Sequence, residues 1–439
     1  MLQCNRRHSC VRERNPAVRY LVPLAALALL AHPAAAQRQS PEAIARAALE
    51  NAPVFDGHND MPGQLRDRFG NVIGNFDFND GIDVPPSGWG SPSMHTDLPR
   101  LREGQVGAQF WSVYVSASLP GPEAAVAVME QIDVTKRLIA RYPDQLELVT
   151  TAAEVEAAMR RGRIASMIGM EGGNAIADSL AVLRQMHELG ARYLTLTHSA
   201  TTRWADSATD APRHGGLSEF GVLVVREMAR LGMMVDLSHV SEETMIDALD
   251  VAEAPVLFSH SGARAVNGHA RNVPDSVLAR MKDNGGIVMV VALPGFLNEE
   301  RRQWFAHRAG YEARLKSLWQ GQPEKVEEGM AQWDAAYPEP QTTIAHLADH
   351  VDHIRDVAGV DYIGIGGDYD GMDTGPVGME DVTGYPALFV ELARRGYSQE
   401  ELEKIASRNM MRVLRAAEAV KAARAGDPPI ESPVPNGDD

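Results

Sequence analysis

The stretch that decides the fold runs from residue 164 to residue 198 and reads IASMIGMEGGNAIADSLAVLRQMHELGARYLTLTH. It opens with an apolar β-type run from Ile164 to Met170 and closes with a second run from Tyr193 to Thr197. Between them lies a helix-type segment that ends in glycine, as helices commonly do. A strand, a helix and a second strand in this order form the unit of a parallel α/β sheet. Each run is followed by a side chain suited to catalysis or metal binding, Glu171 after the first and His198 after the second.

The same alternation continues over most of the chain from Ala52 onward. Eight β-type runs can be identified: Val54 to His58, Ala108 to Val115, Ile164 to Met170, Tyr193 to Thr197, Met233 to Leu237, Val256 to Ser259, Ile287 to Val291, and Tyr362 to Ile365. An open doubly wound sheet would give a similar pattern, but it would spread the strand ends along a line. In a barrel, the C-terminal ends of all strands meet at one mouth. Side chains that could bind a metal or act in catalysis follow six of the eight runs. We therefore expect the α/β class, as a (β/α)8 TIM-like barrel with loop and helical insertions.

Two stretches interrupt the alternation and are the expected insertions. Asp77 to Pro99 is rich in Gly, Pro and Asp, which predicts a long loop near the mouth of the barrel. Asn298 to Pro340 is charged, has a helical pattern and lies between the seventh and eighth runs.

The composition excludes several classes of protein. The chain has 439 residues, of which 44% are hydrophobic and 23% charged, so neither a disordered nor a fibrous chain is expected. It carries 42 Lys and Arg against 59 Asp and Glu, a formal charge of −17. Because such an acidic chain repels phosphate backbones, we expect no nucleic-acid partner.

The first 36 residues have the pattern of a secretory signal peptide. Five arginines precede the apolar stretch LVPLAALALLA and the sequence AAA, which predicts cleavage before Gln37. Cleavage would remove five basic residues, one acidic residue and both cysteines, leaving a charge of −21 and no disulfide. We expect a signal peptide over 1–36, a single (β/α)8 domain over 37–425 and a Pro-rich acidic tail over 426–439. The protein would then be secreted without a membrane anchor, and periplasmic if its source is a Gram-negative bacterium.

Histidines and carboxylates at the strand ends predict a metal centre. His58 and Asp60 are two residues apart, which on an extended strand places both side chains on one side. His239 and His260 each end an apolar run, directly after a serine. Three imidazoles and two carboxylates can hold two divalent metals if Glu171 is shared between them.

Several ordered motifs give the chain a family resemblance: DGHNDMP, GMEGG, RYLTLTHSATTRWADSA, VDLSHVS, PVLFSHSGARAV, ARNVPD and GIGGDYDG, with MHTDLPRLREGQVGAQFWSVYV between the first two. Together they resemble the membrane (renal) dipeptidase family of the metal-dependent amidohydrolase superfamily, from about Ala52 to Ala419. The resemblance implies a homodimeric metallohydrolase with two Zn²⁺ per subunit. Mammalian members have disulfides, a lipid anchor and a tyrosine-containing segment after the seventh strand, none of which is expected here.

The resemblance also implies a role for each site residue. His58 and Asp60 would hold one zinc, His239 and His260 the other, and Glu171 would bridge them. His198 would contact the substrate and stabilise the tetrahedral intermediate, and Arg271 would bind the terminal carboxylate of a dipeptide. Asp368 would transfer a proton to the leaving amine. Asp370 lies in the same motif, and spacing alone does not choose between the two aspartates.

These roles predict an exported zinc dipeptidase that cleaves L,L and L,D dipeptides through a hydroxide bridging the two metals. Two alternatives stay open, an N-acyl amino acid or β-lactam hydrolase on the same site and an inactive metal-dependent binding protein. The remaining histidines are expected to have no role in the site. Among them, His346, His350 and His353 are predicted to lie on a solvated helix, and the others that follow the predicted signal peptide are His95, His187, His214, His269 and His307.

Overall fold

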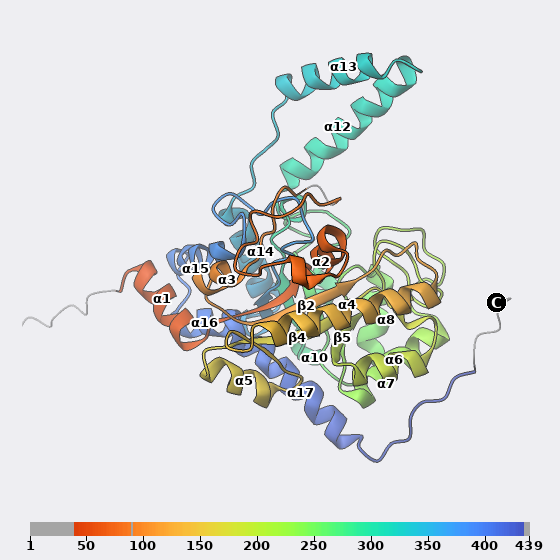
Figure 1. Ribbon diagram of the computed structural model, residues 1–439, viewed down its shortest axis with the longest axis vertical. Coiled ribbons are helices and arrows are strands. Elements are labelled where there is room, and N and C mark those ends of the chain that lie inside the picture. Colours follow the sequence, from red (N-terminus) through yellow and green to blue (C-terminus); the bar gives the residue numbers. More distant parts are fainter. Residues whose placement is uncertain (1–38, 89–90, 434–439) are drawn as a thin grey trace, which may run out of the picture. The chain divides into compact units, whose positions relative to one another are not determined.

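The computed structural model describes residues 39–88 and 91–433. The predicted signal peptide therefore lies outside the described residues, as does the end of the predicted tail. Eight parallel strands pair in the order β2, β1, β9, β8, β7, β6, β5, β4, and a pairing of β4 with β2 closes them into a barrel (Figure 1). The strands are β1 (Val54–Asn59), β2 (Val106–Tyr114), β4 (Ile164–Glu171), β5 (Ala191–Thr195), β6 (Met234–Asp236), β7 (Leu257–Ser261), β8 (Ile287–Val290) and β9 (Ile363–Ile365). The predicted barrel and all eight β-type runs are confirmed.

Sequence analysis missed one short strand, β3 (Leu146–Leu148), which pairs with the N-terminal end of β4. Its three residues alternate too briefly for a period to be recognised.

The strands are buried on both faces, as parallel strands covered by helices are. All eight residues of β4 are buried, and so are all six of β1. Large side chains fill the lower half of the barrel, including Phe55, Phe110 and Tyr193. The Phe55 and Phe110 rings stack with centroids 5.5 Å apart, and the Tyr193 ring packs against Phe110 at a tilt, 4.8 Å away. The interior is thus a packed core that leaves space only at the C-terminal ends of the strands.

Helices surround the barrel and bury one face each (Figure 1). In α4, for example, Val128, Ile132 and Leu138 are buried while Val126 is exposed. The α-helices are α1 (Pro41–Asn51), α2 (Met61–Phe69), α3 (Leu98–Glu103), α4 (Gly121–Arg141), α5 (Ala152–Arg160), α6 (Leu180–Glu188), α7 (Glu219–Leu231), α8 (Glu242–Val251), α9 (Asp275–Leu278), α10 (Met281–Asn284), α11 (Pro294–Leu297), α12 (Glu299–Leu318), α13 (Pro323–Ala336), α14 (Ile344–Val357), α15 (Tyr385–Arg394), α16 (Gln399–Glu403) and α17 (Asn409–Ala423). None of the helices in the described part of the chain is long and apolar enough to cross a bilayer.

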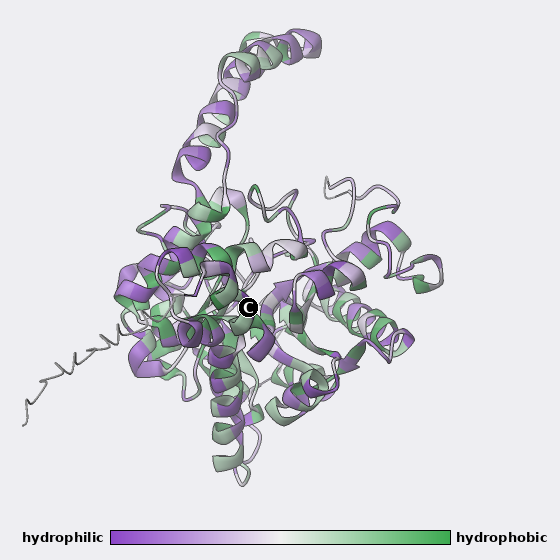
Figure 2. Cartoon of the chain, turned by 90° about the vertical axis from the view of Figure 1, so that its left-hand side faces the viewer, coloured by the Kyte–Doolittle hydropathy of each residue, from purple (hydrophilic) through white to green (hydrophobic). Residues whose placement is uncertain are grey.

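Both predicted insertions are present. The described residues of the first are irregular until α3 begins at Leu98, one residue before the predicted end of the loop. The second forms α12 and α13, which pack against each other and are largely hydrophilic (Figure 2). Only Leu315 and Met330 are buried in this helical pair, so it adds little to the core.

The predicted helix over His346, His350 and His353 is confirmed as α14, but the prediction that it is solvated is wrong for His350. This side chain is fully buried: its Nδ1 accepts a hydrogen bond from the Ala263 amide at 2.8 Å, and its Nε2 faces the Leu297 carbonyl at 3.1 Å. The i, i+4 spacing placed His350 on the inner face, where a histidine is tolerated because both ring nitrogens are paired.

Candidate metal centre and active site

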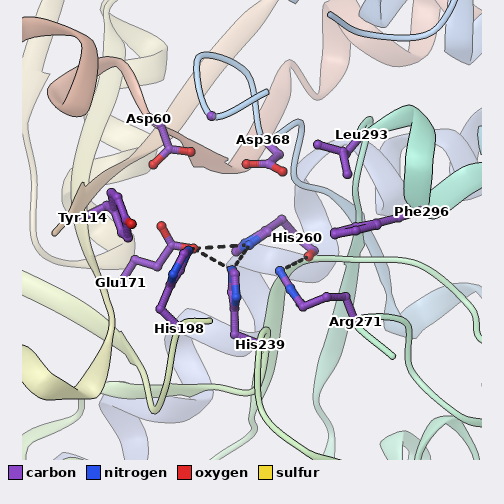
Figure 3. Close-up of a pocket in the computed structure, with 11 residues that line it drawn as sticks. Asp60, Tyr114, Glu171, His198, His239, His260, Arg271, Leu293, Phe296 and Asp368 are labelled. Atoms are coloured by element: carbon purple, nitrogen blue, oxygen red, sulfur yellow. Dashed lines mark hydrogen bonds and ion pairs between the residues drawn. The ribbon is translucent and has the colours of Figure 1, made fainter. Parts of the chain in front are cut away.

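The predicted site residues all meet at the mouth of the barrel. His58 lies in β1, Glu171 ends β4, and His260 lies in β7, while the others follow their strands directly or in the next loop. Seven of the eight line one cavity of about 370 Å³, and His58 lies behind it, with its Nε2 3.4 Å from Asp60 Oδ2. Figure 3 shows the cavity lining, which comprises Asp60, Tyr114, Glu171, His198, His239, His260, Arg271, Leu293, Phe296, Asp368 and Gly371. Residues separated by 310 positions in sequence therefore share one site.

Glu171 lies at the centre of the cluster, between two groups of histidines. Its Oε1 is 2.9 Å from His239 Nε2 and 3.4 Å from His260 Nε2. Its Oε2 is 3.5 Å from His58 Nε2. One carboxylate oxygen thus faces β6 and β7 and the other faces β1, which is the geometry that a carboxylate shared by two cations requires.

The unpaired atoms of this cluster fit metal ions. His239 Nε2 and His260 Nε2 are 3.0 Å apart, and two imidazole lone pairs repel at that distance unless a cation or a shared proton lies between them. His58 Nε2 and Asp60 Oδ1 are buried without a hydrogen-bond partner. Three overlapping sets of ligand atoms each lie within 4.8 Å of one another: His58, Asp60 and Glu171; Glu171, His239 and His260; and His58, His260 and Asp368. Nitrogen and carboxylate ligands of this kind suit Zn²⁺ and similar borderline metals.

Hydrogen bonds behind the imidazoles direct Nε2 of His58 and His260 toward Glu171. Ser259 Oγ donates to the buried Asp236 carboxylate at 2.6 Å, so its lone pairs are left to accept from His260 Nδ1 at 2.8 Å. The Tyr193 hydroxyl donates to the Gly57 carbonyl and lies 3.0 Å from His58 Nδ1. Each ring then holds its proton on Nδ1, and the Nε2 lone pair is free for a metal.

Asp236 anchors this arrangement from below the cavity. It is fully buried and accepts hydrogen bonds from the Ser238 and Ser259 amides and from the Thr195 and Ser259 hydroxyls. These bonds tie the ends of β5, β6 and β7 together. Asp236 is therefore part of the metal centre's support, which the sequence analysis did not identify.

The site is strongly polarised. Burial alone would raise the pKa of Glu171, but His58, His239 and His198 hold it well below the usual range. Burial and the nearby Arg271 guanidinium hold the pKa of His239 well below its usual range, and burial, His58 and Arg271 do the same for His260. An ionised carboxylate beside neutral His239 and His260 is the protonation state in which these three residues bind metal. At His58, by contrast, Tyr193, Glu171 and Asp60 outweigh burial and raise the pKa well above its usual range, so metal binding there would release a proton.

Asp60 and Asp368 lie together on the other side of the cavity. Burial and the charge of Asp60 raise the pKa of Asp368 well above its usual range. The backbone at Gly371 approaches both carboxylates so closely that a Cβ there would lie 2.2 Å from Asp60 Oδ2 and 2.8 Å from Asp368 Oδ1. Glycine is needed at this position because any side chain would enter the space between the two acids.

Arg271 is a buried cation with free hydrogen-bonding capacity. Its side chain is 3% exposed, and Nε and Nη1 have no partner, while Nη2 lies 3.5 Å from the His260 carbonyl. Its guanidinium carbon lies 5.4 Å from the centre of the Phe296 ring. Burial lowers the pKa of Arg271 to about 10, so the group stays charged at neutral pH. A buried guanidinium with two unpaired nitrogens is suited to bind an anionic group.

His198 and Tyr114 form the remaining wall of the cavity. Their ring centroids are 4.5 Å apart, and the His198 ring lies 4.1 Å from that of His239. Burial and the charges of Glu171 and Asp60 raise the pKa of Tyr114 to about 12, so the phenol stays protonated. His198 Nε2 is 3.9 Å from Glu171 Oε1.

Sequence analysis assigned no site residue to the second and seventh strands, yet both contribute to the cavity. Tyr114 is the last residue of β2, and Leu293 and Phe296 follow β8. The position itself was the available signal, since every strand of a barrel ends at the same mouth. Two histidines that were expected to have no role also lie near: His269 stacks on Phe296, and His95 contacts Asp370.

Comparison with known proteins identifies the family. The family model for membrane dipeptidase (peptidase family M19) matches residues 42–427. The chain belongs to this family. Members named dipeptidase 3 from Rattus norvegicus and Homo sapiens are each 39% identical, over 89% and 90% of this chain and 70% and 71% of their own. An uncharacterized dipeptidase of Schizosaccharomyces pombe is 40% identical over 89% of this chain and 87% of its own.

Solved structures of membrane dipeptidase relatives agree with the fold. A metallopeptidase from Rhodobacter sphaeroides, liganded with a phosphinate mimic of the dipeptide L-Ala-D-Ala, aligns with a TM-score of 0.68 at 26% identity. The alignment covers 83% of this chain and 99% of that one. Membership in this family supports a hydrolase of the metallodipeptidase type, with candidate metal ligands at the mouth of the barrel.

Proposed function

We propose that the protein is an exported zinc dipeptidase that hydrolyses L,L and L,D dipeptides at a centre of two Zn²⁺ ions. One observation carries the proposal: the metal-ligand cluster lines the same cavity of about 370 Å³ as Arg271, whose guanidinium has two nitrogens without a hydrogen-bond partner. A cavity of this size admits a short peptide, and a buried cation next to the ligands selects substrates with a free carboxylate.

The grouping of ligand atoms supports the ligand roles that the family resemblance implies. His58 and Asp60 would hold one zinc, His239 and His260 the other, and Glu171 would bridge them. When bound, the metals would supply Lewis-acid polarisation of the scissile carbonyl and an activated water nucleophile.

The other residues position the substrate and move the proton. Arg271 would bind the terminal carboxylate, with Phe296 covering the guanidinium. His198 points into the cavity between Tyr114 and His239, where its ring would stabilise the developing oxyanion (Figure 3). Asp368, whose pKa is raised by burial and by the charge of Asp60, would take up a proton and pass it to the leaving amine.

The L,D part of the proposal is supported by the relative from Rhodobacter sphaeroides, whose ligand mimics L-Ala-D-Ala. The test is a panel of L,L and L,D dipeptides, tripeptides and N-acyl amino acids with zinc-loaded protein. We expect turnover of both dipeptide classes and little of the longer peptides. Cleavage of N-acyl amino acids or β-lactams without any dipeptide turnover would replace this function by the alternative hydrolase.

Export and the dimer rest on the sequence. The basic leader and apolar stretch before Gln37 support export, and the mass of the protein recovered from the secreted fraction tests cleavage. The family resemblance supports a homodimer, which light scattering of the purified protein tests. The exposed Phe305, Leu318 and Tyr337 on and next to α12 and α13 are the first positions to substitute in a search for its interface.

A further inference from the structure

The turn that carries Asp368 has an unusual backbone. Asp368 and Asp370 have φ angles of 61° and 67°, in the left-handed region that non-glycine residues rarely adopt. Two such residues in one turn persist only where the surrounding structure holds them. The turn is joined to β1, because the Asp368 amide donates to the His58 carbonyl and the Asp60 amide donates to that of Tyr369.

His95, which lies in the first insertion, forms two reciprocal hydrogen bonds with Asp370 of this turn. The His95 amide donates to Asp370 Oδ1 at 2.7 Å, and the Asp370 amide donates to His95 Nδ1 at 3.0 Å. Since an amide can only donate, Nδ1 is the acceptor and the ring proton lies on Nε2, which faces the Asp373 carbonyl at 3.3 Å. One imidazole thus forms hydrogen bonds to both ends of the segment from 370 to 373.

Asp370 has a different environment from Asp368. It is 1% exposed, does not line the cavity, and uses its Oδ1 to accept from His95. Its carbonyl accepts from Gln64 Nε2 at 2.7 Å. Asp368, by contrast, faces the cavity beside Asp60 (Figure 3). The two aspartates that spacing could not distinguish have separate surroundings.

We propose that His95 and Asp370 are positioning residues that hold the strained turn so that Asp368 faces the reacting groups. The proposal rests on the proposed dipeptidase function, in which Asp368 transfers a proton. Misplacing such a group by about 1 Å costs on the order of 100-fold in rate. The first insertion would therefore contribute to catalysis although none of its described residues lines the cavity.

The test compares paired variants at the two positions. His95→Leu removes the acceptor for the Asp370 amide, and we expect kcat to fall roughly 10- to 100-fold with KM and zinc content near wild type. His95→Asn restores an acceptor where Nδ1 lies, and should recover most of this loss. Asp370→Asn keeps Oδ1 and should retain most of kcat, whereas Asp368→Asn should lose about 100-fold or more. His353→Leu, at a surface histidine of α14, is the matched control.

Wild-type kcat in His95→Leu, no recovery in His95→Asn, or equal losses in Asp370→Asn and Asp368→Asn would each overturn the proposal. If His95→Leu does not fold, Asp370→Ala, which removes the carboxylate that accepts from the His95 amide, replaces it, and wild-type kcat in that variant would overturn the proposal. Amide hydrogen exchange of residues 368–371 gives a readout independent of activity: faster exchange in His95→Leu than in His353→Leu is expected, and equal rates would contradict it. If the wild type cleaves no dipeptide, the proposed function fails, and this exchange measurement still tests the turn.

Discussion

The two sides of the cavity are built differently and carry opposite charge. Asp60 and Asp368 lie on one side, beyond the ends of β1 and β9, and His198, His239 and Arg271 lie on the other, beyond β5, β6 and β7 (Figure 3). Glu171 stands between them. Under the proposed function, this polarity would orient a zwitterionic dipeptide with its carboxylate toward Arg271 and its amine toward the acids. The cavity could therefore distinguish the two ends of a bound substrate, which neither side could do alone.

The sides also differ in how they are held. The basic side rests on buried strand ends tied together by Asp236. The acidic side rests on a turn in which Asp368 and Asp370 have left-handed backbone conformations. His95, from the first insertion, forms hydrogen bonds with this turn. We therefore expect substitutions behind the basic side to affect metal binding, and those behind the acidic side to affect rate.

The largest effect is expected from removing one metal ligand on either side. His239→Ala and Asp60→Ala should each lower the zinc content from two ions to one per subunit and abolish nearly all activity, because half of the cluster loses a ligand. Metal analysis after dialysis measures the first and dipeptide turnover the second. Two tightly bound ions in either variant would contradict the assignment of that residue.

Arg271→Ala should act on binding rather than on metal content. Loss of the charged hydrogen bonds to the substrate carboxylate is expected to raise KM for dipeptides roughly 10- to 100-fold. Arg271→Lys keeps the charge but not the planar fork, so it should recover only part of the loss. An unchanged KM in Arg271→Ala would refute this carboxylate contact.

Asp236→Asn tests whether the basic side depends on its buried anchor. The carboxylate accepts two hydroxyls on Oδ2 and two backbone amides on Oδ1, whereas an amide has only one acceptor oxygen. One pair of donors would therefore lose its acceptor, and His260 should be less well oriented. Zinc affinity is expected to fall about tenfold, as measured by competition with a chelator. Asp370→Asn, behind the acidic side, is the control and should leave zinc affinity unchanged; an equal loss in both variants would erase the distinction between the sides.

The smallest effect concerns pH and His350, which braces the Ala263 amide behind the basic side. Burial lowers the pKa of His350 from its ordinary 6.5 to about 4. Below pH 6.5 the unfolded chain therefore takes up a proton that the folded chain does not, and stability falls as the pH drops toward 4. The contribution between pH 7 and pH 5 is about 2 kcal/mol.

His350→Gln removes this titration while keeping a donor and an acceptor. Chemical denaturation at pH 7 and pH 5 should show a smaller loss for His350→Gln than for the wild type. His353→Gln, on the exposed face of α14, should behave like the wild type. Identical pH dependence in all three proteins would show that His350 does not titrate as its burial implies.

Sequence patterns predicted the barrel because each strand is a local apolar run. They also predicted which residues end those strands, from His58 to Asp368. They missed β3, which is too short to show a period, and Tyr114, Leu293 and Phe296, whose residue types suggest core rather than site. The roles of Asp236 and His95 depend on contacts with segments far along the chain, which no local pattern records.

The sequence by itself determined the strand ends and the ligand types, because hydrophobic periodicity and motif spacing are properties of neighbouring residues. Only the tertiary structure decided which atoms face one another. It showed Glu171 between two groups of imidazoles, left Arg271 unpaired in the cavity, buried His350, and separated Asp368 from Asp370. The physical reason is that burial and hydrogen-bond geometry arise from packing between segments as far apart as His95 and Asp370.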